Sequence, residues 1–215
     1  MKRVFGKIEV IFDISYLSIA FFLGIYFFIK GEDSLVKAAG IMGLILAAGD
    51  SFHLLPRILT ILKNDPEKYR AALGFGKLVT SITMTVFYLF LYRIGSHVSE
   101  TTLPLLWNIL LLLSFLRIFL CLLPQNKWFE ADPPLRWSIL RNLPFFLIGI
   151  CVSVFYLIFA RGAAGFEWMW AAILLSFAFY LPVVLWVGKN PKVGMFMLPK
   201  SCVYLWMLFM CTALL

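Results

Sequence analysis

Charged residues are scarce in this chain. They make up 14% of its 215 residues, whereas 62% are hydrophobic. A soluble domain carries about 25% charged residues, so the composition excludes an ordinary soluble protein. The alternation of apolar and polar residues typical of a membrane β-barrel strand is also missing. Because a helix needs about 20 apolar residues to cross a bilayer, the composition indicates membrane-spanning helices.

Residues that bind metals or react covalently are few. The chain has two histidines and four cysteines. Cys121, Cys151, Cys202 and Cys211 all lie in apolar stretches without a CxxC spacing, so we expect them to pack as small apolar side chains. No GxSxG, HExxH, P-loop or dinucleotide-binding motif occurs. We therefore predict no metal site and no cofactor.

Long apolar stretches with short connections fill the chain. They lie near 9–30, 36–60, 73–94, 101–123, 139–160, 166–188 and 195–215. Each is long enough for a helical span and too long for a strand. We predict an all-α integral membrane protein: a seven-transmembrane-helix bundle forming a single domain over 1–215.

Basic residues gather at alternate ends of these spans, which predicts the orientation. One set of ends carries Lys2, Arg3, Lys7, Arg57, Lys63, Lys68, Arg70, Lys77, Lys127, Arg136, Arg141, Lys189, Lys192 and Lys200, and the other carries Lys30, Lys37, Arg93 and Arg161. Since cytoplasmic ends are rich in Lys and Arg, we expect a cytoplasmic N-terminus and an external C-terminus, in a bacterial cytoplasmic membrane. The net charge of +8 then serves orientation, and the expected partner is the lipid bilayer rather than nucleic acid.

Polar residues inside the spans collect in the cytoplasmic third. They are Glu9, Asp13, Asp50, His53, Arg57, Lys77, Arg117, Arg141, Asn142 and Lys200. Spacings of three and four place Glu9 with Asp13 on one helix face, and Asp50, His53 and Arg57 on another. For Lys77, Arg141 and Lys200 we favour snorkelling towards the headgroups.

The carboxylate of Asp50 is too short to snorkel and therefore needs a partner. A charge near mid-bilayer costs a few kcal/mol unless it is paired or hydrated, and Arg57, Lys77, Arg117 and Lys200 are the candidate partners. Two interpretations stay open. Asp50 is either half of a buried ion pair that fixes helix register or part of a polar cavity open to the cytoplasm.

The segment 48–57 is the strongest candidate site. Pro56 prevents a helical hydrogen bond to the carbonyl of Phe52, and Gly49 permits close backbone approach. A free carbonyl, a carboxylate, an imidazole and a guanidinium thus share about two turns, and irregular backbone at membrane depth is tolerated where it lines a cavity.

A weak internal repeat involves the second and sixth spans. Phe179-Tyr180-Leu181-Pro182 is similar to Phe52-His53-Leu54-Leu55-Pro56, and Gly76-Lys77 and Pro199-Lys200 open the spans that follow. One interpretation is a parallel duplication of three spans, a linking span and three spans, as in many carriers. The other is a chance similarity between apolar helices.

Around Ser51-Phe52-His53 the chain resembles the second helix of the alkaline ceramidase, adiponectin-receptor and haemolysin III superfamily over about ten residues. That resemblance implies a seven-helix fold and, for the hydrolase members, zinc held by three histidines. Here the second histidine, His97, falls in an outer loop, so the zinc site cannot be built.

The charge balance within the spans favours an anionic ligand. Basic residues outnumber acidic ones there, so we expect an anionic small molecule or a phosphate-bearing lipid headgroup. The leading hypothesis is a carrier or binding protein whose pocket is lined by Glu9, Asp13, Asp50, His53, Arg57, Lys77, Arg117, Asn142, Tyr180 and Lys200. The alternatives are a metal-free lipid-modifying enzyme that uses Asp50 and His53, and a sensor or assembly factor without chemistry.

Overall fold

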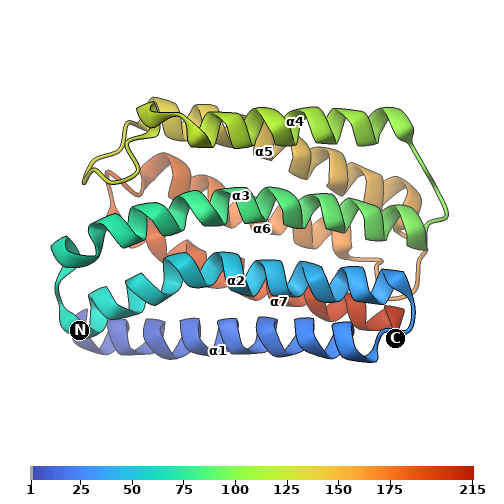
Figure 1. Cartoon of the computed structure of the whole chain (residues 1–215), viewed down its shortest axis with the longest axis horizontal. Coiled ribbons are helices and arrows are strands. Elements are labelled where there is room, and N and C mark those ends of the chain that lie inside the picture. The colour runs from blue at the N-terminus through green and yellow to red at the C-terminus, as the bar shows by residue number, and fades with distance from the viewer. Residues whose placement is uncertain (1) are drawn as a thin grey trace.

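Over residues 2–215, seven α-helices run back and forth along one long axis (Figure 1). The structure is a computed structural model that describes residues 2–215, with the side chains of residues 6–190 and 192–215. The helices are α1 (Lys2–Lys30), α2 (Ser34–Lys63), α3 (Pro66–Val98), α4 (Pro104–Leu122), α5 (Leu135–Phe155), α6 (Met169–Trp186) and α7 (Met197–Met210). Short helical pieces accompany them: η1 (Pro124–Asn126), the π-helix η2 (Tyr156–Ala160), η3 (Pro191–Phe196) and η4 (Cys211–Leu214).

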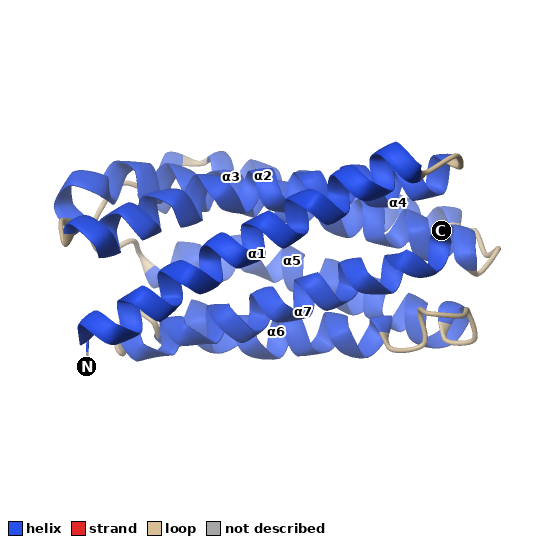
Figure 2. Cartoon of the chain, turned by 90° about the horizontal axis from the view of Figure 1, so that it is seen from below, coloured by secondary structure: helices blue, strands red, loops and turns tan. Residues whose placement is uncertain are grey.

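Each of the seven helical segments is long and apolar enough to cross a membrane. The described residues form no strand, and the loops lie only at the two ends of the bundle (Figure 2). These observations confirm the prediction of an all-helical protein with seven candidate spans, and they fit a polytopic integral membrane protein.

Turn chemistry explains why several helices differ from the predicted spans. Asp65 accepts a hydrogen bond from the backbone N–H of Lys68, and Pro66 occupies the first turn, so α3 begins well before residue 73. Pro104 likewise starts α4. Asp33 caps α2 by accepting from the N–H of Leu35, and that bond lowers the pKa of its carboxyl group. The ends of the last span are 3₁₀ turns, η3 and η4.

Small residues bring α1 and α2 into close contact. A Cβ atom on Gly24 would lie 2.8 Å from the backbone nitrogen of Leu44, and one on Gly40 would lie 2.7 Å from that of Phe28. Membrane helices associate through such small-residue surfaces because lipid supplies no hydrophobic force between them. Elsewhere the core is aromatic, with Tyr88 packed edge-to-face on Phe145 at 5.2 Å.

The chain termini lie at opposite ends of the bundle (Figure 1). We call the end at which α1 begins the N-terminal end of the bundle. Two basic residues used for the orientation, Lys2 and Arg3, have side chains outside those that the structure describes. The cytoplasmic location of this end and the internal duplication remain predictions.

Candidate functional site

An exposed ion pair joins α1 and α2 at the N-terminal end of the bundle. The Nε atom of Arg57 donates to Glu9 at 2.7 Å. The two predicted polar stripes on these helices therefore face each other. Arg57 has its own acidic partner, which makes it a poor counter-ion for Asp50.

Asp50 is hydrogen-bonded to a tyrosine. The hydroxyl of Tyr16 donates to Asp50 Oδ2 at 2.6 Å, and Tyr16 is buried. The ammonium of Lys200 is the positive charge that acts on this carboxylate. Asp50 therefore still fits both interpretations, a buried ion pair and a polar cavity. Sequence reasoning missed Tyr16, although it lies seven residues after Glu9 and three after Asp13, on the same helical face.

Asp13 lies deeper in the bundle than Glu9 and lacks a complete set of partners. It is only 4% exposed, and its Oδ2 atom accepts no hydrogen bond from the described residues. The charged groups acting on it are Glu9, Arg57 and Asp50. A buried carboxylate oxygen without a donor is costly, so this atom is a candidate ligand contact.

The segment 48–57 packs tightly on α3. Thr80 Oγ1 donates to the carbonyl of Gly49 at 3.0 Å, and Gly76 lies directly against the carbonyl of Phe52. The carbonyl left free by Pro56 thus contacts backbone rather than a cavity.

His53 and Lys77 lie beside this contact. Among the side chains that the structure describes, Nδ1 of His53 has no hydrogen-bond partner, and no hydrogen bond joins His53 to Asp50. Lys77 is exposed, as snorkelling requires.

Lys200 and Arg141 are buried rather than snorkelling, which corrects the interpretation of these two residues. Lys200 is 7% exposed, and its Nζ atom lies 4.8 Å from the ring centre of Tyr180 and 4.9 Å from that of Tyr204. The two aromatic rings stabilise the ammonium by cation–π attraction. The side chain points into the bundle because this aromatic box offers it a partner there.

Arg141 holds the connection between α4 and α5. Its Nη1 atom donates to Asn126 Oδ1 at 3.0 Å, and its guanidinium lies 4.2 Å from the ring centre of Trp128. Asn126 in turn donates to the carbonyls of Leu120 and Leu123 and so caps the end of α4. Arg141 is therefore explained as a structural residue, and sequence reasoning missed Asn126.

Tyr180 and Asn142 join α6 to α5. The hydroxyl of Tyr180 donates to Asn142 Oδ1 at 2.9 Å, and Asn142 Nδ2 donates to the carbonyl of Ser138 at 2.8 Å. Tyr180 thus has one face against Lys200 and its hydroxyl bound to α5. These contacts connect the two predicted residues to Lys200 across three helices.

Arg117 is the least satisfied side chain of this region. It is 2% exposed, and its Nε and Nη1 atoms have no hydrogen-bond partner within the described part of the chain. Its guanidinium carbon lies 3.3 Å from the ring centre of Phe145. The ion pairs of the described side chains involve Arg57, Arg70 and Lys127, so Arg117 has no carboxylate in contact.

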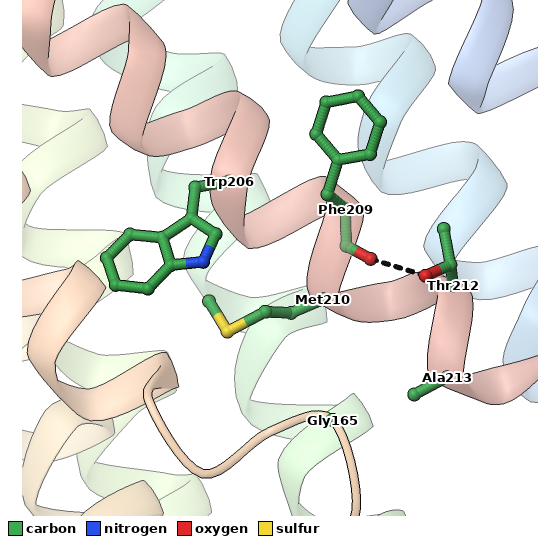
Figure 3. Close-up of a pocket in the computed structure, with 6 residues that line it drawn as sticks. All are labelled: Gly165, Trp206, Phe209, Met210, Thr212 and Ala213. Carbon is green, nitrogen blue, oxygen red and sulfur yellow. Dashed lines mark hydrogen bonds between the residues drawn. The ribbon is translucent and has the colours of Figure 1, made fainter.

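One surface hollow lies away from these residues, and a second is lined in part by Ala48 and Ser51 of the segment 48–57. One, of about 340 Å³, is lined by Gly165, Trp206, Phe209, Met210, Thr212 and Ala213, where Thr212 donates to the carbonyl of Phe209 at 2.7 Å (Figure 3). The other, of about 490 Å³, lies between α1 and α2 and is mostly apolar. Within residues 2–215 no three His, Cys, Asp or Glu side chains are close enough to hold a metal.

Comparisons with protein-family models, curated proteins and solved structures give no match. The function is therefore inferred from the geometry of the site.

Proposed function

We propose that the protein binds or carries an anionic ligand at Arg117 and Lys200, in the half of the bundle nearer its N-terminal end. The observation that carries this proposal is the buried guanidinium of Arg117 with two unpaired nitrogen atoms and no acidic partner. A buried charge without a partner costs several kcal/mol. An anion that contacts Arg117 would remove this cost, and Arg is well suited to phosphate and carboxylate groups.

The surrounding charges support an anion rather than a cation. Arg117, Arg141 and Lys200 are all buried, and the described side chains place no carboxylate in ion-pair contact with them. Asp13 and the half-buried Asp50 belong to other helices, α1 and α2.

We propose that this end of the bundle faces the cytoplasm, in a bacterial cytoplasmic membrane, because most lysines and arginines lie there. The ligand then reaches Arg117 from the cytoplasm or the inner leaflet. Free organic anions and phosphate-bearing lipid headgroups share the chemistry that Arg117 and Lys200 recognise.

The metal-free enzyme receives less support than a binding protein. Acid–base catalysis by Asp50 and His53 would need the two groups to share a proton path. Asp50 instead accepts from Tyr16. No specific contact favours the sensor or assembly factor either.

The test uses purified protein in lipid discs and measures thermal shifts with phosphate, citrate and phosphatidylglycerol. We expect at least one of these anions to raise the melting temperature of the wild type and to have no effect on Arg117→Met. Arg93→Met is the matched control, because Arg93 is exposed on α3. If Arg117→Met responds to the anions as the wild type does, the proposed site is wrong.

A further inference from the structure

Lys200 connects the proposed anion site to the carboxylate of Asp50. The charges of Arg117 and Asp50 both act on Lys200, and the charge of Lys200 acts on Asp50 in return. The ammonium lies 4.8 Å from the ring centre of Tyr180 and 4.9 Å from that of Tyr204, and the same two tyrosines lie within electrostatic range of Arg117. An anion bound to Arg117 and Lys200 would therefore compete with Asp50 for the charge of Lys200.

Asp50 and Lys200 are electrostatic neighbours that form no direct ion pair. The ion pairs of the described side chains include neither residue. The carboxylate of Asp50 is held by the hydroxyl of Tyr16, which donates to Oδ2 at 2.6 Å. Oδ2 can accept this bond whether the carboxyl group is charged or neutral, so Oδ1 is the oxygen that can take up a proton. Neither hydrogen bonding nor packing thus prevents Asp50 from becoming neutral.

Several other titratable and charged groups lie on the helices around Asp50 and Lys200. They include Glu9, Asp13 and Tyr16 on α1, His53 and Arg57 on α2, Lys77 and Tyr88 on α3, Arg117 and Cys121 on α4, Arg141 on α5, Tyr180 on α6 and Tyr204 on α7. The charges acting on Asp13 are those of Glu9, Arg57 and Asp50, and Glu9 is paired with Arg57. Asp50 is therefore the carboxylate whose charge balance changes when Lys200 contacts an anion.

We propose that the anion and a proton bind together, the proton on the carboxylate of Asp50. When the anion takes up the charge of Lys200, Asp50 is left without a counter-charge inside the membrane, where an unpaired charge is costly. Oδ1 then takes a proton from water, while Oδ2 keeps the hydrogen bond from Tyr16. This inference rests on the proposed anion site and adds the proton as a second bound species. Anion affinity accordingly falls as the pH rises.

The first measurement uses the wild-type protein in lipid discs, so it does not depend on whether a variant folds. Sulfate and glycerophosphoglycerol, the soluble headgroup of phosphatidylglycerol, are titrated by calorimetry in bis-Tris, imidazole and Tris buffers. Neither probe changes its charge near neutral pH, so a proton taken up belongs to the protein. Because the buffers differ in their enthalpy of ionisation, the measured heats give the number of protons bound per anion. The two probes distinguish a free anion from a lipid headgroup.

We expect uptake of about one proton per anion, and a dissociation constant that rises about tenfold for each unit increase in pH over the range of this uptake. Asp50→Asn keeps an oxygen for the bond from Tyr16 but cannot bind the proton, so its anion binding should take up no proton and should not vary with pH. Glu32→Gln is the control and should behave as the wild type, because Glu32 is exposed at the other end of the bundle.

Infrared difference spectra provide a test that needs no variant of Asp50. Addition of sulfate to the wild type should produce the C=O band of a neutral carboxyl group. Tyr16→Phe removes the donor to Oδ2, so it should shift this band to higher frequency. A band that is absent, or that does not respond to Tyr16→Phe, would mean that the proton is not on Asp50.

The possible failures are distinguishable. If a probe binds through Arg117 without proton uptake, the anion site stands and the proton coupling is overturned. If Asp50→Asn still takes up a proton, or if Asp13→Asn alone abolishes the uptake, the proton binds elsewhere and the inference is likewise overturned. If binding does not depend on Arg117, or no anion binds, the proposed function itself fails and the inference with it.

Discussion

Replacing Arg117 by methionine should stabilise the ligand-free protein while it abolishes anion binding. Methionine has a similar length and carries no charge, so the variant removes the unpaired guanidinium without leaving a large void. Replacing a buried ion pair by apolar residues of similar volume stabilises proteins by up to about 4 kcal/mol, and a buried charge left without a partner costs about 3–5 kcal/mol. The contact with Phe145 at 3.3 Å is lost in the exchange, and a desolvated cation–π contact contributes about 2 kcal/mol.

Subtracting the cation–π contribution of about 2 kcal/mol from a cost of about 3–5 kcal/mol leaves an expected net gain of about 1–3 kcal/mol. For a chain of this size, 1 kcal/mol corresponds to a change of roughly 2–4 °C in melting temperature. We expect Arg117→Met to melt about 2–12 °C above the wild type in discs of a neutral glycolipid, measured by intrinsic tryptophan fluorescence. The difference should shrink or reverse when a bound anion stabilises the wild type.

A lower melting temperature for Arg117→Met than for the wild type, in the absence of anion, would refute this reasoning. It would mean that Arg117 already has a stabilising partner within the protein. Arg93→Met, with its exposed side chain, should change the melting temperature by less than about 1 °C in either direction.

Three further predictions concern a hydrogen bond, a helix contact and the orientation in the membrane. Tyr16→Phe removes the donor to Asp50 and should lower the free energy of unfolding by about 1–3 kcal/mol; a denaturation midpoint equal to that of the wild type would contradict it. Gly76→Val places a side chain against the backbone of α2 and should reduce the yield of folded protein in size-exclusion chromatography. Gly188→Val is the control, because Gly188 has open space around it. Equal yields of the two variants would disprove the tight contact at Gly76. A periplasmic reporter fused after Leu215 should be active and one between α2 and α3 inactive, and the reverse pattern would invert the orientation.

The helices and the concentration of polar residues at one end could be predicted from the sequence. Apolar length defines a membrane span, and spacings of three and four place Glu9, Asp13, Asp50 and Arg57 on helix faces whatever the neighbours are. Gly49 was likewise predicted as a site of close backbone approach, and it contacts α3.

The partners of these residues could not be predicted, because they depend on how each helix is rotated against the others. Tyr16 becomes the donor to Asp50 only once α1 and α2 pack together. Lys200 is buried because Tyr180 and Tyr204, on two helices, surround its ammonium. Snorkelling was the wrong expectation for Lys200, because it was inferred only from the position of Lys200 near a helix end. The rings on neighbouring helices are not visible in the sequence.

The most direct test of the anion site is an experimental structure of the protein in native lipid discs, resolved well enough to show groups bound at Arg117. We expect density for an anionic group within about 3.2 Å of Nε or Nη1 of Arg117. Hydrogen bonds from both nitrogens to oxygens of the protein itself, with no bound anion, would contradict it.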